Sequence, residues 1–159
     1  MIADVFISGT PLTQTQKVAE ACSTSLDNLM QQTLQTLKQD IERQNVIVRC
    51  DTLPDVQGNR GDMQAVFTNI LNSIINYPTE SRLYIYINYS KDGHQVNGDI
   101  IELSKGPAIH FLTNLRADGA WQQHHTFLLK QCHEMLYKFG AALVISDYPS
   151  GSLFSISFR

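Results

Sequence analysis

The clearest hydrophobic pattern in the chain lies between residues 63 and 77. Apolar residues recur there in pairs, at Val66/Phe67, Ile70/Leu71 and Ile74/Ile75. This spacing places a continuous apolar stripe on one side of a helix. The opposite side is polar and consists of Gln64, Thr68, Asn69, Asn72, Ser73 and Asn76. Asparagine is a poor helix former, so helix propensity does not explain this side, which is either a solvated surface or the wall of a pocket.

The segments before this helix predict a strand, a long helix and a second strand. Residues 5–7 form a short apolar run that ends in turn residues, which predicts a short strand. From residue 13 to residue 41 the apolar positions follow one stripe, which predicts a single long helix. Residues 46–50 are rich in β-branched side chains and predict the second strand.

The segments directly after the central helix predict a β-hairpin. Pro78 ends the helix, because the residue before a proline is disfavoured in the helical region. Residues 82–90 alternate between two sets of side chains, as a strand with one buried face does. Residues 91–94 then supply a turn, and residues 95–103 return as a second strand.

The last third of the chain begins without a clear period. We expect one or two helical turns at residues 110–115 and a mobile loop at residues 116–125. A third helix is predicted at residues 128–139, where apolar positions again follow one stripe and Gly140 provides a stop. Two final strands are predicted at residues 142–146 and 153–158.

This order of elements favours an α+β fold. Hairpins rather than helical crossovers join the later strands, which is typical of a mixed, mostly antiparallel sheet. We therefore expect a two-layer α/β sandwich with three helices on one face of the sheet. The 159 residues are expected to form a single domain, 1–159.

Composition narrows the classes of function and location. The net charge is −3 and no run of Lys or Arg occurs, so neither nucleic acid nor an anionic membrane is expected as a partner. The three cysteines are far apart and odd in number, which argues against a disulfide framework. No segment has the pattern of a membrane span or a signal peptide. A soluble, cytoplasmic domain is expected.

With these elements in place, the chain resembles the ATP-binding domain of sensor histidine kinases, which belongs to the superfamily of gyrase, heat-shock-chaperone and mismatch-repair ATPases. Residues 53–59 (Leu-Pro-Asp-Val-Gln-Gly-Asn) are similar to the family's Leu-Pro-x-Val-x-Gly-Asp lead-in. The residues near the third helix also match: Phe139-Gly140-Ala141 and Gly151-Ser152-Leu153-Phe154 stand where the family has His-Gly-Gly and Gly-x-x-Phe. The resemblance implies a Bergerat-type ATPase fold over nearly the whole chain.

The family's asparagine box would lie on the central helix. Asn69 matches the first Asn of that box, which binds Mg²⁺, and Tyr77 matches its aromatic residue. Ser73 stands in place of the second Asn, and Asn76 in place of the basic residue that faces the phosphates. Because Mg²⁺ favours oxygen ligands and phosphates, Asn69 alone would make a sparse metal site.

The glycine boxes of the family are altered as well. The first would lie at Ser104, Gly106 and Ala108, with Ser104 replacing the carboxylate that accepts a hydrogen bond from adenine and Ala108 replacing a glycine. A serine hydroxyl lacks the charge that strengthens such a bond. The second would lie at residues 124–130, which contain no glycine. Backbone amides that approach phosphates at a helix start need small residues.

Several other residues are of types that can be phosphorylated or bind metals, but structural roles explain them better. His133 and Glu134 resemble the pair at which histidine kinases are phosphorylated, yet they fall in the ATP-domain helix and are expected to be ordinary surface residues. His124 and His125 have no Cys, Asp or Glu at ligand spacing and are expected in a solvated loop. Trp121 is expected to be either a packing anchor or part of a partner-binding patch. Cys132 lies on an apolar stripe and is expected in the core.

The resemblance therefore implies a degenerate ATP-binding domain of a two-component sensor histidine kinase or kinase-like phosphotransfer protein. It would act in signal transduction by contacting a response-regulator receiver or a kinase dimerisation domain, with no cofactor and no catalytic residue assigned. The vestigial pocket would comprise Asn69, Ser73, Asn76, Tyr77, Ser104, Gly106 and Ala108. Whether it is an enzyme stays open: the alternative is a divergent but working domain that binds Mg-ATP through Asn69. The chain is expected to be either a fragment of a longer sensor or a free-standing module.

Overall fold

The computed structural model describes residues 23–91 and 107–158. In chain order the elements are β1 (Ser23–Ser25), α2 (Leu26–Thr36), α3 (Lys38–Arg43), β2 (Ile47–Cys50), β3 (Asp55–Gln57), α4 (Arg60–Ile75), β4 (Tyr84–Ser90), β5 (Ala108–Thr113), α5 (Gly119–His124), α6 (Thr126–Tyr137), β6 (Ala142–Tyr148) and β7 (Gly151–Ser157). The strands predicted at residues 5–7 and 95–103 and the turn at residues 92–94 lie outside the described ranges.

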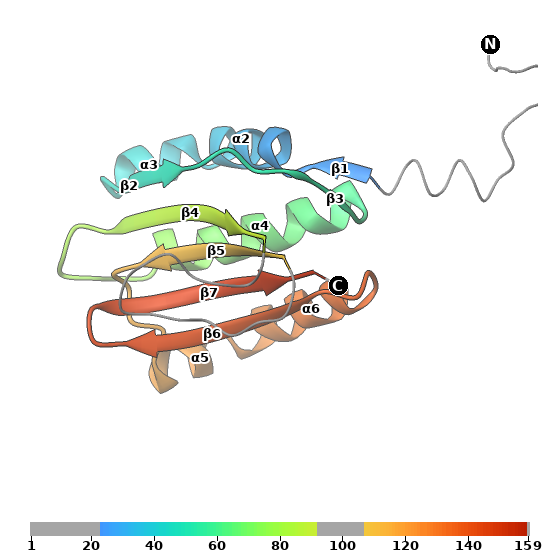
Figure 1. Ribbon diagram of the computed structural model, residues 1–159. Coiled ribbons are helices and arrows are strands. Elements are labelled where there is room, and N and C mark those ends of the chain that lie inside the picture. The colour runs from blue at the N-terminus through green and yellow to red at the C-terminus, as the bar shows by residue number, and fades with distance from the viewer. Residues whose placement is uncertain (1–22, 92–106, 159) are drawn as a thin grey trace, which may run out of the picture.

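Five strands form one mixed sheet in the order β2-β4-β5-β7-β6 (Figure 1). β2 runs parallel to β4, and the remaining neighbours are antiparallel. β1 and β3 form a separate antiparallel pair. The helices lie on one side of the main sheet, so the predicted α+β class with a mostly antiparallel sheet is confirmed.

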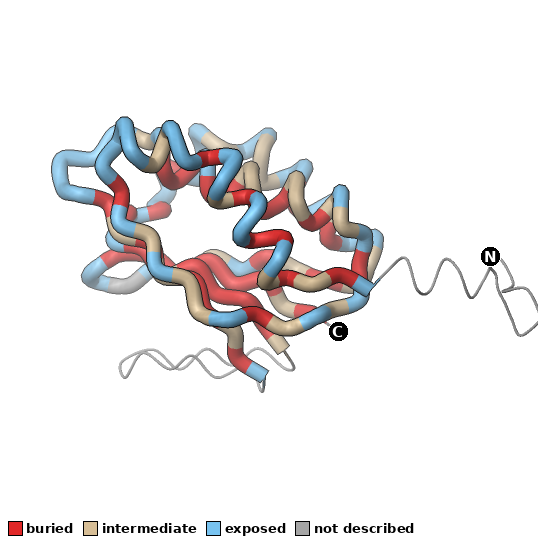
Figure 2. The backbone as a smooth tube through the Cα atoms, turned by 90° about the horizontal axis from the view of Figure 1, so that it is seen from above, coloured by how far each residue is buried: buried red, intermediate tan, exposed pale blue. Residues whose placement is uncertain are grey.

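The core lies between the helices and one face of the sheet. Because side chains alternate along a strand, Ile85, Ile87 and Phe111 share that face. Phe67 of α4 contacts Phe111 edge-on with ring centroids 5.9 Å apart. Figure 2 shows that the buried positions concentrate where the helix layer meets the strands. This packing orients α4 and thereby fixes the direction of its polar side chains.

The single helix predicted from residue 13 to residue 41 is wrong in the described range, where Ser23–Ser25 form β1 and the helix after it is broken in two. Leu37 separates α2 from α3 and has φ −92° and ψ 6°. Just before it, the hydroxyls of Thr33 and Thr36 donate to the carbonyls of Leu29 and Gln32. Such bonds to the preceding turn compete with the backbone ladder and bend helices. Within the described ranges there are therefore five helices rather than three.

Residues 110–125 were predicted wrongly. The expected helical turns at 110–115 form the central strand β5, in which Ile109 and Phe111 face the helices while His110 points to the other face. Both faces are buried there, so the simple alternation of apolar and polar residues is lost. The expected loop at 116–125 contains α5, whose start is capped by Asp118 Oδ1 accepting from the Trp121 amide at 3.0 Å.

Candidate functional site

The C-terminal end of the polar side of α4 borders a cavity, whereas Gln64, Thr68 and Asn69 of the same side do not line it. A cavity of about 280 Å³ lies between the end of α4 and the junction of α5 with α6. It is lined by Asn72, Ser73, Asn76, Tyr77, Pro78, His124, His125 and Leu128. Three residues of the predicted vestigial pocket, Ser73, Asn76 and Tyr77, are thus brought together.

Asn69 does not line this cavity; it faces α6. The Asn69 side chain makes a hydrogen bond with the thiol of Cys132, one helix across. Cys132 is completely buried, as the sequence predicted for a core residue. Burial raises the pKa of the Cys132 thiol to about 11, and the bond from Asn69 offsets part of that rise. The donor in this bond is Asn69 Nδ2, which holds the side chain against α6 without using the amide oxygen that a metal would need.

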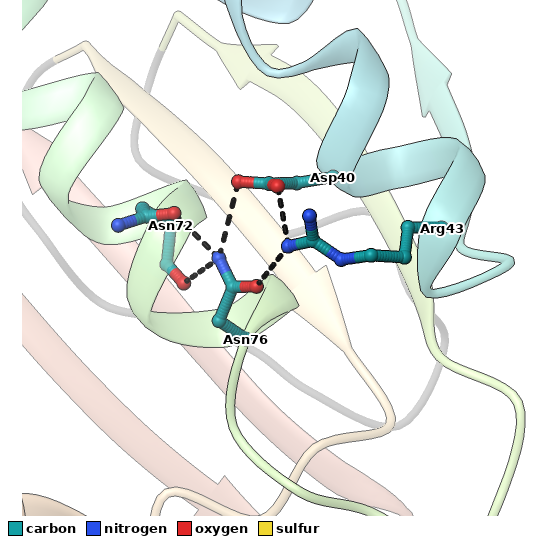
Figure 3. Close-up of polar contacts among 4 residues, drawn as sticks. All are labelled: Asp40, Arg43, Asn72 and Asn76. Atoms are coloured by element: carbon teal, nitrogen blue, oxygen red, sulfur yellow. Dashed lines mark hydrogen bonds and ion pairs between the residues drawn. The ribbon is translucent and has the colours of Figure 1, made fainter.

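Asn76 is held in a polar cluster that joins α3 to α4 (Figure 3). Its Nδ2 donates to Asn72 Oδ1 at 2.6 Å and to Asp40 Oδ2 at 3.4 Å, while Arg43 donates to its Oδ1 at 3.4 Å. Arg43 also pairs with Asp40 at 2.5 Å. A positive charge thus lies beside Asn76, but the Asp40 carboxylate neutralises it.

Ser73 is buried and also has an internal partner. Its hydroxyl donates to the carbonyl oxygen of Ile70 at 2.6 Å. A serine in a helix commonly satisfies its hydroxyl proton in this way, through the preceding turn. The Ser73 oxygen therefore presents only acceptor lone pairs to the cavity, which disfavours an anion at this position.

The wall opposite α4 is formed by aromatic rings. Tyr77 contacts His124 and His125, with ring centroids 5.9 and 5.6 Å apart. His125 Nδ1 lies 2.8 Å from the carbonyl oxygen of Trp121. A carbonyl can only accept, so a proton is assigned to Nδ1, which donates to it. Both histidines, expected in a solvated loop, form part of a structured wall instead.

Behind this wall lies Trp121, which is completely buried. Its indole stacks on His125 at 4.1 Å and meets Phe154 of β7 edge-on at 5.3 Å. Among the described atoms, its Nε1–H has no hydrogen-bond partner. Of the two interpretations offered by the sequence, the packing anchor is the one that this burial supports.

The fold of the chain is found in solved structures of histidine kinases. Histidine kinase AdeS of Acinetobacter baumannii superposes with a TM-score of 0.62 at 12% identity, and the chain matches over 84% of its own length and 64% of that chain. The catalytic domain of histidine kinase ThkA gives 0.64 at 12% identity, over 84% and 91% of the two chains. The mycobacterial sensor histidine kinase MprB gives 0.59 at 13% identity, over 84% and 93%.

This is a histidine kinase ATPase-like fold. No protein-family model and no curated protein matches the sequence. The identities of 12–13% in these superpositions establish the histidine kinase-like fold alone, and the chain spans less than two thirds of the AdeS structure. None of the helices in the described ranges is long and apolar enough to span a bilayer.

The predicted residues of the first glycine box are not all brought to the cavity of this histidine kinase-like fold. Ser104 and Gly106 lie outside the described ranges. Ala108 begins β5, where it pairs with Ser90 and Ser157. It therefore shares the sheet face that points away from α4, whereas the cavity lies on the α4 side. Ala108 was assigned to the pocket because it stands where the family has the second glycine of the first glycine box, and its place in β5 does not bring it to this cavity.

The sequence did not predict that residues 114–125 form an ordered segment, whose end at His124 and His125 lines the cavity. Its start is fixed to β7, since the Ala117 amide donates to Ser152 Oγ at 2.7 Å. The available signal was Asp118 followed by Gly119 and Ala120, a short polar cap before a buried aromatic residue. Across the described ranges, no three His, Cys, Asp or Glu side chains gather into a metal-ligating group.

A buried polar cluster around His110 lies on the face of the sheet that points away from the helices. His110 is fully buried, with Nε2 2.7 Å from Ser90 Oγ and Nδ1 2.8 Å from Ser155 Oγ. Burial lowers the pKa of His110 to about 4, so the ring is neutral at pH 7. A neutral imidazole has one donor and one acceptor nitrogen, and two hydroxyls can satisfy both. With no access for a substrate to a fully buried ring, this cluster is a stabilising feature of the sheet.

Proposed function

We propose that this domain is a degenerate ATP-binding domain of a two-component sensor histidine kinase or a kinase-like phosphotransfer protein. It acts in signal transduction through contacts with other proteins and binds little or no nucleotide. The proposal combines the histidine kinase-like fold with a cavity whose polar side chains already have partners inside the chain.

The observation that carries the proposal is the polar cluster of Asn76, whose Nδ2 donates to Asn72 and Asp40. The resemblance assigns the position of Asn76 to a basic residue that faces the phosphates, and here the neighbouring Arg43 is paired with Asp40. For Mg²⁺ the resemblance offers Asn69 alone, and no three His, Cys, Asp or Glu side chains gather within the described ranges. Mg²⁺ demands near-octahedral oxygen ligation, so these residues do not fit it. No step of the proposed function passes through a metal or a nucleotide.

The connection before α6 also supports the proposal. His125 alone separates α5 from α6, so no loop between these helices remains that could close over a bound phosphate chain. The cavity of about 280 Å³ is just below the range for small-molecule sites, which begins at about 300 Å³. Both features favour a domain that keeps its scaffold for purposes other than nucleotide binding.

A receiver or kinase dimerisation domain is proposed as the partner. The outward side of α6 carries Phe127 and Tyr137, which are 73% and 84% exposed. Large exposed rings are expected where a protein surface is covered by another protein. These rings favour contact through α6, on the surface opposite the buried Cys132.

The test is a thermal titration with Mg-ADP. A ligand at 100 times its dissociation constant stabilises a folded protein by about 2.7 kcal/mol, which moves the melting temperature clearly. We expect no shift at millimolar Mg-ADP. A clear shift that is lost in Asn69→Ala but kept in Gln64→Ala, a substitution on the same helix outside the cavity, would overturn the proposal in favour of a working nucleotide site.

A further inference from the structure

Two polar side chains on the α4 wall of the cavity, Asn76 and Ser73, use their protons within the protein. Asn76 Nδ2 carries two protons and lies near three oxygens, Asn72 Oδ1 at 2.6 Å, the Asn72 carbonyl at 3.3 Å and Asp40 Oδ2 at 3.4 Å. The Ser73 hydroxyl donates into the preceding helical turn, and Pro78, which also lines the cavity, has no backbone N–H. These residues therefore offer oxygen lone pairs to a ligand rather than protons.

The charge nearest to this wall is a carboxylate. Asp40 pairs with Arg43 at 2.5 Å, and the two side chains are 28% and 63% exposed. Figure 3 shows both of them on α3, with Asn76 reaching toward the pair from the end of α4. Solvent screens an exposed charge more strongly than a partly buried one, so the carboxylate outweighs the guanidinium on the protein side. The potential at the wall therefore favours a cation.

The opposite wall supplies aromatic and apolar surface. Tyr77 contacts His124 and His125 with ring centroids 5.9 and 5.6 Å apart, and Leu128 also lines the cavity. The Nδ1 proton of His125 is bonded to the Trp121 carbonyl oxygen behind this wall. A cation within about 6 Å of the centre of a tyrosine ring is attracted to the face of that ring. The methylene groups of a charged chain can pack on the same surface.

The cavity is open to solvent and has room for a small chain. Asn72, Asn76 and His124 are exposed, whereas Ser73 is buried, so a ligand that enters from solvent can reach an acceptor oxygen inside. The volume is about 280 Å³. An enclosed cavity of about 150 Å³ holds benzene, so this one can accept a chain of a few carbon atoms with a polar head.

We propose that the cavity between α4 and α6 binds a primary ammonium group on a short alkyl chain, either as a free amine or as the side chain of a lysine. An ammonium has three donors and no acceptor, which suits the lone pairs of Ser73 Oγ and Asn76 Oδ1. Asp40 balances its charge, and Tyr77 and Leu128 cover its methylene groups. This inference rests on the proposed function in one respect, since it names a ligand for a cavity that takes little or no nucleotide.

The first test titrates the protein with n-butylammonium at constant ionic strength. The side-chain amide resonances of Asn72 and Asn76 and the backbone amide of Tyr77 report on the cavity by NMR. We expect these resonances to shift saturably at millimolar n-butylammonium and not with n-butanol or butyrate. Tetramethylammonium has the charge but no N–H, and should bind at least severalfold more weakly. The absence of saturation with n-butylammonium, or equal binding of butyrate, would overturn the proposal.

A matched pair of substitutions on α3 tests the role of the carboxylate. Asp40→Asn and Glu42→Gln each remove one negative charge, but the Glu42 side chain is exposed and Asp40 bonds to the cavity wall. Asp40→Asn should raise the dissociation constant of n-butylammonium about fivefold, the usual upper effect of one surface ion pair, and Glu42→Gln should leave it unchanged. Equal effects of the two substitutions would mean that only net charge matters, and the proposal would fail.

Arg43→Gln tests the same carboxylate in the opposite direction. It frees Asp40 from its pairing with Arg43 and should tighten n-butylammonium binding severalfold. Unchanged or weaker binding in a folded Arg43→Gln variant would contradict the proposal, even if Asp40→Asn failed to fold. The backbone amide resonances of β5 and β7 show whether each variant is folded.

A last titration distinguishes the two sources of the ammonium group. Nα-acetyl-lysine methylamide carries the same head group on a peptide backbone. Binding as tight as that of n-butylammonium would assign the cavity to a lysine side chain of a partner protein, and severalfold weaker binding would assign it to a free amine; both outcomes support an ammonium site. Failure of the amine titrations alone would refute this inference and leave the proposed function standing, whereas a thermal shift with Mg-ADP would refute the proposed function.

Discussion

Replacement of His110 gives the sharpest test of the buried polar cluster, through the pH dependence of stability. The folded-state pKa of His110 is lowered from 6.5 to about 4 because the ring is desolvated. In the unfolded chain the ring protonates near its ordinary pKa, so between these values the unfolded state binds more protons than the folded state. Stability must therefore rise with pH across this window and fall as the pH drops below 6.5.

The magnitude follows from these two pKa values. Lowering the pH from 7 to 5 should remove about 2 kcal/mol of unfolding free energy through His110, and lowering it to 4 should remove about 3 kcal/mol in total. Such a loss is a large fraction of the stability of a small domain. Ser90 and Ser155, which bond to the ring, do not titrate in this range and cannot compensate.

The assay is urea unfolding at pH 7, 6, 5 and 4 for the wild type and for His110→Gln. A glutamine amide offers one donor group and one acceptor to the two serine hydroxyls but has no proton to gain. Contributions of all other titrating groups are common to both proteins and cancel in the difference. We expect the wild type to lose stability faster than the variant. Parallel pH profiles would refute the assignment of a neutral, buried His110.

Two further predictions concern the frame around the candidate site. Gly151→Ala should destabilise the β6–β7 hairpin by about 1–3 kcal/mol in urea unfolding, because the new Cβ would lie 2.0 Å from the Thr113 carbonyl oxygen at φ +156°; wild-type stability would contradict this geometry. Cys132 should resist modification by a thiol reagent at pH 8 until urea unfolds the domain, since its pKa is about 11 and it is fully buried. Rapid labelling of native protein, traced by mass spectrometry to Cys132 rather than Cys50, would be inconsistent with the α4–α6 packing.

The elements with a strong single period could be predicted from the sequence. The apolar pairs of α4 gave its location and its buried side correctly, and the alternation at residues 84–90 gave β4. β5 could not be predicted in this way, because a histidine occupies a fully buried position in the middle of the strand. Its burial depends on pairing with β7, more than 40 residues later, as the His110–Ser155 contact shows. Local sequence carries no sign of that pairing.

In the candidate site, too, features within one helix could be predicted, whereas contacts between distant segments could not. The sequence predicted from spacing that Ser73 and Asn76 share one helix side, and the resemblance to the asparagine box added Tyr77 to them. It could not predict that Asn76 bonds to Asp40 or that Asn69 bonds to Cys132, since these partners lie far away in the chain. Trp121 was recognised as conspicuous, but its role depends on α5, a helix too short to show a hydrophobic period.

The two walls of the cavity differ in how they are supported. Ser73 belongs to α4 and Tyr77 directly follows it, and the other side of this helix is fixed in the core through Phe67 and Ile70. His124 and His125 belong to the junction of α5 and α6, which is held by ring contacts with Tyr77 and by the bond from His125 to Trp121. A larger side chain at position 73 would therefore meet a wall that the core holds in place, whereas a change at position 124 would alter a wall made of exposed ring contacts.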